Sequence, residues 1–325
     1  MLTILLPTYS NRNGFFNRII NYMVDCNITY PILVADSSKS ETIDVNIQLI
    51  KKVESELNIK YKLYHHETEG FEKITNAVSE IQTKYTLIAA DDDFYVPSSI
   101  ERLLAFLETN SDYSVALGNT VSFHLEGDYL CKGSIKSFHC DFVNEHTKNQ
   151  IFSYKRLLSH LKCYSPTFYG IHRTKQLQYI LKTLISLNIK DFRFSELFPS
   201  CLSVIQGKVK IFDCLYLLRQ GSIKKKYEQY KTLPYLMHDW IAHPDWSNSY
   251  KIFRKSLAEH LVHYDRINID DANKVIKIAV WEYLMSQNRH QCEDKRFSLQ
   301  ALLQKSSPYH NDFLPIYNAI YNNKQ

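Results

Sequence analysis

The feature that most constrains the fold is an apolar run of strand character, residues 85–90, that ends in three consecutive aspartates, Asp91–Asp93. Three adjacent carboxylates repel one another, so the arrangement costs stability unless a cation lies among them. Hard divalent cations such as Mg²⁺ and Mn²⁺ prefer oxygen ligands and commonly take one or two carboxylates plus substrate phosphates. The end of a buried strand is also where open α/β sheets bind ligands. We therefore expect a metal–diphosphate site here, the alternative being a solvated acidic turn that caps the following helix.

The first 110 residues alternate four times between strand and helix patterns. Short apolar runs predict strands at 2–6, 32–35, 61–65 and 87–90, and apolar residues at helical spacing follow each run. Strands joined by helical crossovers imply a parallel sheet with helices on both faces. Polar residues follow three of the strands, namely Thr8 and Tyr9, Asp36, and Asp91–Asp93. We expect these residues to meet at one edge of the sheet.

The pattern after residue 110 is mixed. Residues 113–125 and 167–172 are strand-like, residues 128–143 predict a hairpin or a loop, and residues 209–212 and 215–218 predict a last pair of strands. Helices are expected at 151–161, from 173 to 184 and from 194 to about 207. Strand patterns disappear after about residue 221, and three or so helices are expected there. We therefore expect one unit at 1–220, with halves at 1–110 and 111–220, and a helical region at 221–325.

Composition excludes several classes of protein. The 325 residues suffice for one large or two modest domains, and only 8 are glycine, with neither a P-loop nor a G-x-G-x-x-G fingerprint. The net charge is +5, and the one notable basic run is Lys224–Lys226. This run could contact an anionic membrane surface or an anionic substrate, or it could be a solvated face. The density of basic residues is below that of nucleic-acid binders, so we expect no nucleic-acid partner.

Cysteine usage and hydropathy indicate the compartment. The 7 cysteines are odd in number and include no C-x-x-C pair, which fits free thiols in a reducing environment. The chain starts without a signal-peptide pattern, and no apolar run approaches the ~20 residues needed to span a membrane. We expect a soluble, cytoplasmic protein.

Several motifs, in order, resemble the nucleotide-sugar-dependent glycosyltransferases of the GT-A fold, in particular the large family 2 of inverting enzymes. The resemblance covers residues 2 to about 220, and its strength lies in the order and spacing of the motifs. These are residues 6–12, the opening strand and turn; 34–38, the second strand with its Asp; Gly70, Lys73 and Asn76, the "G…(R/K)xxN" segment; Asp91–Asp93, the Asp-X-Asp motif; 165–173, the acceptor-side strand; and 194–196, the acidic motif.

The resemblance implies a role for each matching residue. The base pocket would be lined by Pro7, Thr8 and Tyr9, and Asp36 would accept from the uracil imide. The nucleotide would also be bound by Lys73, Asn76, Asp91 and Asp92. The metal would be held by Asp91 and Asp93, and Glu196 would be the general base. Each has an alternative from the residues alone. Asp36 could form an Asx turn, Asp92 could cap a helix, and Glu196 could be a solvent-facing acid in a first helical turn. Lys73 and Asn76 could be structural.

The chain departs from the family pattern at two places. The acidic motif is commonly Glu-Asp in the family, whereas a single Glu196 follows Ser195 here. Where the family often has a histidine after the last strand, this chain has Arg219 and Gln220. The third metal ligand is thus open: His238 or His243 could serve, or Arg219 and the basic run could neutralise the diphosphate instead.

The resemblance implies an activity and a setting. The activity is inverting, metal-dependent transfer of a sugar from a nucleotide-sugar, a UDP-sugar, to a glycan or lipid-linked acceptor, with Mn²⁺ or Mg²⁺ as cofactor. The setting is assembly of a bacterial surface glycan, such as capsule or lipopolysaccharide, peripheral to the membrane at the cytoplasmic face of the inner membrane. Two alternatives remain open: a nucleotidyltransferase, and a non-catalytic protein that binds a sugar nucleotide or glycan.

Overall fold

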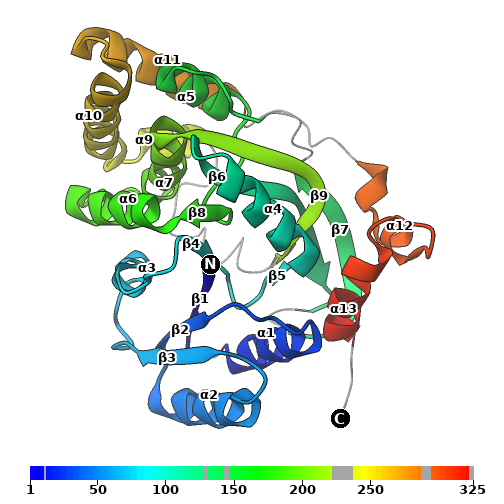
Figure 1. Ribbon diagram of the computed structural model, residues 1–325. Coiled ribbons are helices and arrows are strands. Elements are labelled where there is room, and N and C mark those ends of the chain that lie inside the picture. Colours follow the sequence, from blue (N-terminus) through cyan, green and yellow to red (C-terminus); the bar gives the residue numbers. More distant parts are fainter. Residues whose placement is uncertain (11, 128–130, 143–146, 222–236, 287–293, 322–325) are drawn as a thin grey trace.

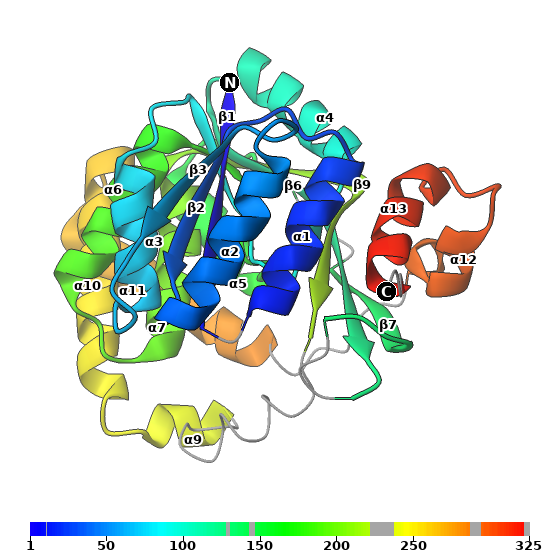
Figure 2. The same cartoon turned by 90° about the horizontal axis from the view of Figure 1, so that it is seen from below.

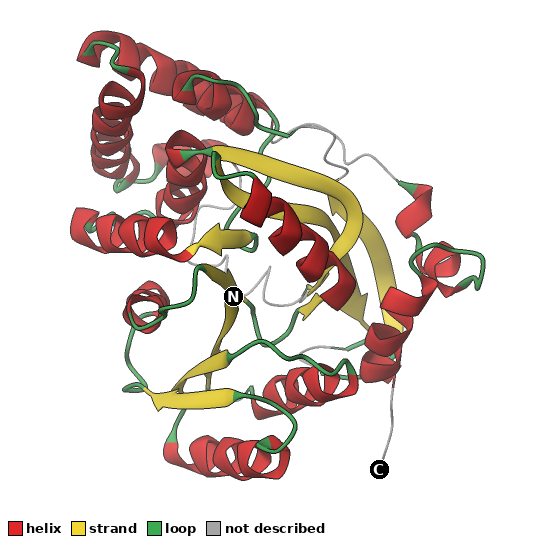
Figure 3. Cartoon of the chain, in the orientation of Figure 1, coloured by secondary structure: helices red, strands yellow, loops and turns green. Residues whose placement is uncertain are grey.

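The computed structural model describes residues 1–10, 12–127, 131–142, 147–221, 237–286 and 294–321 (Figure 1). Figure 3 shows strands gathered at the centre and helices around them. In chain order the elements are β1 (Leu2–Tyr9), α1 (Asn13–Asp25), β2 (Ile32–Ser37), α2 (Ser40–Val53), β3 (Ile59–Leu63), α3 (Gly70–Ser79), β4 (Tyr85–Ile88), β5 (Phe94–Tyr95), α4 (Pro97–Thr109), β6 (Tyr113–Leu125), β7 (Ile135–Phe142), α5 (Ser153–Lys162), β8 (Ile171–Arg173), α6 (Thr174–Leu187), α7 (Phe192–Gln206), β9 (Lys208–Gln220), α9 (Met237–Ala242), α10 (Trp246–Asp265), α11 (Ile269–Ser286), a 3-10 turn (Lys295–Phe297), α12 (Leu299–Leu303) and α13 (His310–Tyr321).

One mixed sheet forms the centre of the molecule. Its strand order is β3-β2-β1-β4-β8-β6-β9-β5, and β7 pairs with β6 outside this path. The first four strands in this order are parallel, as predicted from the alternation of strand and helix. β8 runs antiparallel to both β4 and β6, and β6 and β9 run parallel to each other. The predicted mostly parallel α/β architecture is confirmed.

Alternate residues of the parallel strands supply two apolar layers. Ile4 and Leu6 of β1 belong to the larger core, which the apolar faces of α1 and α2 complete. Leu5, between them in sequence, belongs to a second cluster that includes residues of α3 and α6. Successive side chains of a strand point to opposite faces, so helices are needed on both faces to bury these runs. Figure 2 shows α1 and α2 together, with α3 and α6 grouped apart from them.

The tail is helical, as predicted, and its described part holds five α-helices rather than three. α10 and α11 pack against α5 and α7, whereas α13 lies against α1 on the other side of the molecule (Figure 1). Phe253 of α10 and Phe313 of α13 are both fully buried in the larger core. The tail therefore covers two separate places on the sheet domain. None of the helices in the described ranges is long and apolar enough to cross a membrane.

Two strand predictions were wrong in their extent. Residues 209–218 form one strand, β9, rather than a pair, because irregularities in its register with β6 absorb the predicted interruption at residues 213–214. The strand predicted at 167–172 is confined to Ile171–Arg173. Its first residues form a turn instead, in which the Gly170 N–H donates to the Thr167 carbonyl at 2.9 Å.

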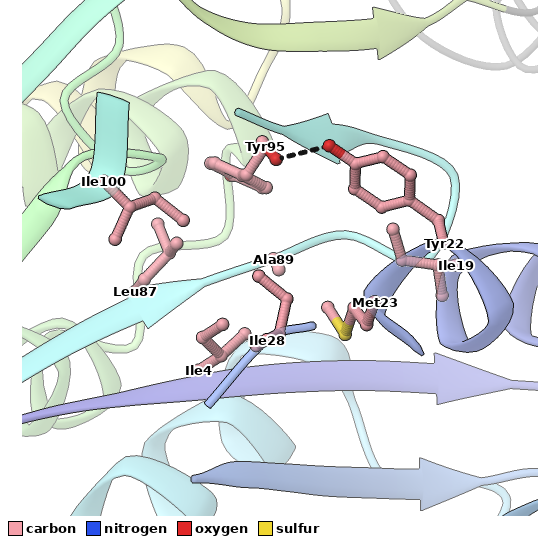
Figure 4. A pocket seen from close by; sticks show the side chains of 9 residues that line it. All are labelled: Ile4, Ile19, Tyr22, Met23, Ile28, Leu87, Ala89, Tyr95 and Ile100. Carbon is pink, nitrogen blue, oxygen red and sulfur yellow. Dashed lines mark hydrogen bonds between the residues drawn. The ribbon is translucent and has the colours of Figure 1, made fainter. Parts of the chain in front are cut away.

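A small apolar cavity between α1 and the sheet belongs to the core and is not a ligand site. Its volume is about 10 Å³, and it is lined by Ile4, Ile19, Tyr22, Met23, Ile28, Leu87, Ala89, Tyr95 and Ile100 (Figure 4). Such a volume holds at most about one water molecule. The hydroxyl of Tyr22 donates to the carbonyl of Tyr95 at 2.9 Å, which ties α1 to β5 beside the cavity.

Two glycines give a matched test of packing in the sheet. A Cβ at Gly118 of β6 would lie 2.6 Å from Tyr216 Cβ and 3.0 Å from the Cys214 carbonyl, whereas a Cβ at Gly70 meets no atom within 4 Å. We expect Gly118→Ala to lower the free energy of unfolding by about 1–3 kcal/mol, because the contact forces the strands apart. Gly70→Ala, at the start of α3, should leave it unchanged or raise it by up to about 1 kcal/mol. Urea denaturation of both variants measures the difference, and equal stabilities would contradict the packing.

Candidate functional site

The ends of β1, β2 and β4 meet at one edge of the sheet, as predicted. Thr8 and Asp36 are paired across β1 and β2, and the Thr8 hydroxyl donates to Asp91 Oδ2 at 2.7 Å. Lys73, from the first turn of α3, reaches the same edge. Its Nζ donates to the Thr8 carbonyl at 2.6 Å and to Ser37 Oγ at 2.8 Å. Four of the predicted nucleotide-binding residues therefore lie together.

Asp36 is fully buried at the end of β2 and holds its surroundings together. Its Oδ1 accepts the Ser38 N–H at 2.7 Å, which is the Asx-turn bond expected of an Asp in this position. Its Oδ2 accepts from Asn46 Nδ2 at 2.8 Å and from the Tyr61 hydroxyl. Burial, and then its own bond to Asp36, raise the pKa of Tyr61, so this hydroxyl remains a donor at neutral pH. The carboxylate is fixed in position before any ligand arrives.

Arg12 neutralises the first two acids of the Asp91–Asp93 turn. Its Nε donates to Asp91 Oδ1 at 2.7 Å, and its Nη2 forms ion pairs with Asp91 and, at 2.6 Å, with Asp92. Burial lowers the pKa of Arg12, but the bonds and charges of the two carboxylates outweigh burial and leave the pKa raised. The turn does not cap α4, because the N-cap residue is Val96 and no side chain caps this helix.

Asp93 contacts a different segment, the end of β9. Its Oδ1 accepts the Gln220 N–H at 3.0 Å, and its Oδ2 lies 3.6 Å from Arg219 Nε. Burial, and then the negative charge of Asp92, raise the pKa of Asp93 to about 7, although Arg219 opposes the rise. A buried carboxylate with such a pKa lacks a sufficient positive charge nearby. Asp93 is thus an acid of the turn that an additional cation would stabilise.

Lys73 is the one ammonium group held inside this cluster among the described residues. It is 3 % exposed, and burial lowers its pKa to about 8, although the charges of Asp36 and Asp91 oppose the change. The group remains mostly charged at neutral pH. It lies 5.8 Å from the centre of the Tyr9 ring, so the basic and aromatic groups of the site are neighbours.

Glu196 lies in the first part of α7, on the side of the site formed by the second half of the chain. The carboxylate of Asp191 caps this helix by accepting the Phe194 N–H at 3.0 Å, and it also accepts Trp240 Nε1 at 2.7 Å. Glu196 is exposed to solvent. Burial raises its pKa, opposed by the charges of Arg219 and Arg193. Arg219 therefore acts electrostatically on both Glu196 and Asp93.

The remaining predicted residues are less involved in this network. Pro7 is half-buried in β1, Tyr9 at its end is exposed, and Asn76 is exposed on α3. The imidazole of His243 lies 3.8 Å from Asp245 in an exposed pair. The side chain of His238 and the run Lys224–Lys226 lie outside the described residues.

The described residues do not form a metal cage by themselves. No group of three or more His, Cys, Asp and Glu side chains in the described ranges is arranged to hold a metal ion. Both oxygens of Asp91 already accept from Thr8 and Arg12. Magnesium sites commonly combine one or two carboxylates with substrate phosphates rather than using protein ligands alone. The residues fit that type of site, with Asp93 as the carboxylate short of positive charge.

Three participants were missed by the sequence analysis. Arg12 was noted only as the last residue of the motif at 6–12, although a cation near three adjacent acids was expected to relieve their repulsion. Tyr169 accepts Arg219 Nη2 at 3.3 Å, and its ring lies 4.6 Å from the Arg219 guanidinium carbon. Arg18 on α1 is 2 % exposed. Nothing in the sequence pattern distinguishes Arg18 from a solvent-facing arginine.

The sheet order, the flanking helices and the acid turn at the edge of the sheet define a GT-A fold. No protein-family model matches the chain, and no curated protein matches it either. Among solved structures, the chain is similar to S. aureus TarS 1-349, with a TM-score of 0.53 and 15 % identity over 98 % of this chain and 80 % of that one. The TarS 1-349 complex with UDP-GlcNAc gives a TM-score of 0.51 at 15 % identity, over 98 % and 81 % of the two chains. At this identity the similarity shows a shared fold.

The raised pKa of Asp93 predicts a pH-dependent penalty on stability. An Asp in an unfolded chain has a pKa near 3.9, so between about pH 4 and pH 7 the unfolded state loses this proton while the folded state keeps it. Stability from this group therefore falls as the pH rises through that window. We expect Asp93→Asn to raise the melting temperature relative to wild type more at pH 8 than at pH 5, with a free-energy difference on the order of a few kcal/mol at most.

Asp112→Asn is the matched control for this measurement. Asp112 pairs with Lys208 at 2.6 Å, and this bond lowers its pKa. Asp112 is thus ionised in both states at pH 5 and pH 8, and its substitution should have the same effect at the two values. An Asp93→Asn effect that is also independent of pH would contradict the raised pKa.

Proposed function

We propose that the chain is a glycosyltransferase that takes a sugar from a UDP-sugar and transfers it, with inversion, to a glycan or lipid-linked acceptor. The observation that carries this proposal is the gathering of Thr8, Asp36, Lys73 and the acid turn at one edge of the sheet. Such an edge is where open α/β sheets bind nucleotides. The fold shared with TarS 1-349, one structure of which contains UDP-GlcNAc, supports a nucleotide-sugar as the donor.

The donor-side residues take the following roles in this proposal. Pro7, Thr8 and Tyr9 line the base pocket, and the fixed carboxylate of Asp36 accepts from the uracil imide. Lys73 faces the phosphates with its ammonium group, and Asn76 contributes from the same helix. Asp91 and Asp92 pair with Arg12 in the structure, and in the nucleotide complex they contact the nucleotide as well.

A divalent metal fits this site only together with the donor diphosphate. Asp93, with Asp91, would hold Mn²⁺ or Mg²⁺, and the ion would act as a Lewis acid that stabilises charge on the leaving diphosphate. Arg219 and Arg12 supply positive charge from the protein at the same acids. Residues of β9 and of the turn after β1 therefore share in neutralising the diphosphate.

Glu196 is the general base of the proposed reaction. The bond between the anomeric carbon and the diphosphate oxygen breaks while the acceptor oxygen bonds to the opposite face of the sugar, through an oxocarbenium-like state. The acceptor hydroxyl proton passes to the Glu196 carboxylate. Because the pKa of Glu196 is raised by partial desolvation, the carboxylate is a stronger base than a glutamate with the ordinary pKa.

The organisation and setting follow from the same proposal. Residues 1–220 form the transferase domain, with the nucleotide-binding half at 1–110, and residues 221–325 form the helical region that packs on it. We place the reaction in bacterial surface-glycan assembly, such as capsule or lipopolysaccharide, with the protein in the cytoplasm or peripheral to the inner membrane.

Nucleotide selectivity tests the donor site. We expect UDP, but not GDP or CMP, to raise the melting temperature, and Mn²⁺ to increase the effect. A ligand at 100 times its Kd stabilises the native state by about 2.7 kcal/mol, which a thermal-shift assay resolves. Asp36→Asn should abolish the preference for UDP, because an amide replaces the carboxylate that the proposal assigns to the imide. No response of the wild-type protein to any nucleotide would refute the donor site.

Catalysis by Glu196 is tested separately from binding. We expect Glu196→Gln to bind UDP like wild type but to release UDP from UDP-GlcNAc or another UDP-sugar roughly 10²–10⁴-fold more slowly, because a positioned base contributes about this factor. Glu259→Gln, an exposed glutamate on α10, is the control and should turn over normally. Turnover of Glu196→Gln at the control rate would remove Glu196 from the mechanism.

A further inference from the structure

Arg18 joins three segments that are far apart in the sequence. From the buried face of α1, its Nη1 donates to the Cys131 carbonyl at 2.5 Å and to Gln220 Oε1 at 2.6 Å. Its Nη2 donates to the Asp92 carbonyl at 2.8 Å. Two of these three partners belong to the acid turn and to the end of β9, the segments that form the Asp93 and Arg219 pair. The side chain is 2 % exposed, so it acts from beneath the site.

The charge of Arg18 is held without a carboxylate in contact. None of the ion pairs among the described residues involves Arg18, and its guanidinium carbon lies 4.7 Å from the centre of the Phe94 ring and 5.3 Å from that of Phe15. Burying a cation in this way is costly, and removing a partner of a buried charge is more costly still. A planar guanidinium with donors in a fixed fork sets the directions of its acceptors, which an ammonium group cannot do.

The bonds of Arg18 bear directly on the geometry of Asp93. Gln220, whose side chain Arg18 holds, donates its own backbone N–H to Asp93 Oδ1 at 3.0 Å. Asp92, whose carbonyl Arg18 holds, is the preceding residue of the turn. Arg219, next to Gln220, lies 3.6 Å from Asp93 Oδ2. The fork therefore fixes both sides of the Asp93–Arg219 pair at once.

We propose that Arg18 is a positioning residue for the donor diphosphate. It holds the acid turn and the end of β9 in the relative position at which Asp93 and Arg219 together face the phosphates. This inference rests on the proposed function. Arg18 itself does not touch the donor, because its side chain is 2 % exposed and its Nη1 and Nη2 donate to groups of the protein. Its effect should fall on the phosphate part of the ligand and not on the base, which contacts the opposite side of the site at Asp36.

The test compares uridine with UDP as probes on Arg18→Lys and a matched control. Arg18→Lys keeps the charge and loses the fork. Arg156→Lys is the control, because Arg156 is also buried and donates to backbone carbonyls, those of Val204 and Ile205 among them, away from the acid turn. We expect Arg18→Lys to weaken UDP binding about tenfold to hundredfold with uridine binding unchanged, as measured by calorimetry or NMR titration. Arg156→Lys should bind both probes like wild type.

Each outcome has a defined meaning. A folded Arg18→Lys that binds UDP like wild type, or that loses UDP and uridine equally, overturns the positioning role. If Arg18→Lys does not fold, Gln220→Ala is the substitute, because it removes one hydrogen bond of the Arg18 guanidinium and keeps the backbone N–H to Asp93. This variant should show the same loss of affinity for UDP and none for uridine. Wild-type affinity for UDP in Gln220→Ala also overturns the role. A wild-type protein that binds no UDP refutes the proposed function, and this inference falls with it.

Discussion

The structure depends on how three neighbouring carboxylates are neutralised inside it. Asp91 and Asp92 are paired with Arg12, Asp93 lies beside Arg219, and the carbonyl of Asp92 is held by Arg18. These arginines come from the turn after β1, from α1 and from the end of β9. The negative charge of the acids therefore attracts the arginines of three segments, and these segments meet at the turn. Because Asp93 remains undercompensated, the same arrangement leaves a local demand for a further cation.

The position of the acid turn explains why the pairing of its carboxylates with arginines joins distant parts of the sheet. The turn follows β4, in the parallel half of the sheet, and leads directly into β5, which pairs with β9 at the far end of the strand order. The Tyr95 hydroxyl donates back to the Ile88 carbonyl at 3.0 Å, so β5, the last strand in this order, is brought close to the end of β4. In Figure 1, β5 lies near β4 although β8, β6 and β9 separate them in the sheet.

The parallel half could be predicted from the sequence because its signals are local. Each apolar run lies beside a helix of clear periodicity, and Thr8, Asp36 and Asp91 end adjacent strands, so their meeting follows from topology. The second half depends on pairings between distant residues, such as β6 with β9, and an interrupted apolar run does not reveal that a register irregularity will carry one strand through it. Arg18 escaped prediction for a related reason. Its partners are mostly backbone carbonyls, which every residue has, so no residue type marks them.

Two separate parts of the chain position the two proposed functional groups. The acid turn is held by Arg12, from the turn after β1, and by Arg18 of α1, whereas α7, which carries Glu196, is held by Asp191. The Asp191 carboxylate accepts both the Phe194 N–H and the indole N–H of Trp240, and Phe194 packs against Trp240 and Phe253 of the tail. The helical tail therefore determines where the proposed base stands, while the acid turn determines where the phosphates would lie. Arg219 is the group whose charge acts on both, through its distance of 3.6 Å from Asp93 and its effect on the pKa of Glu196.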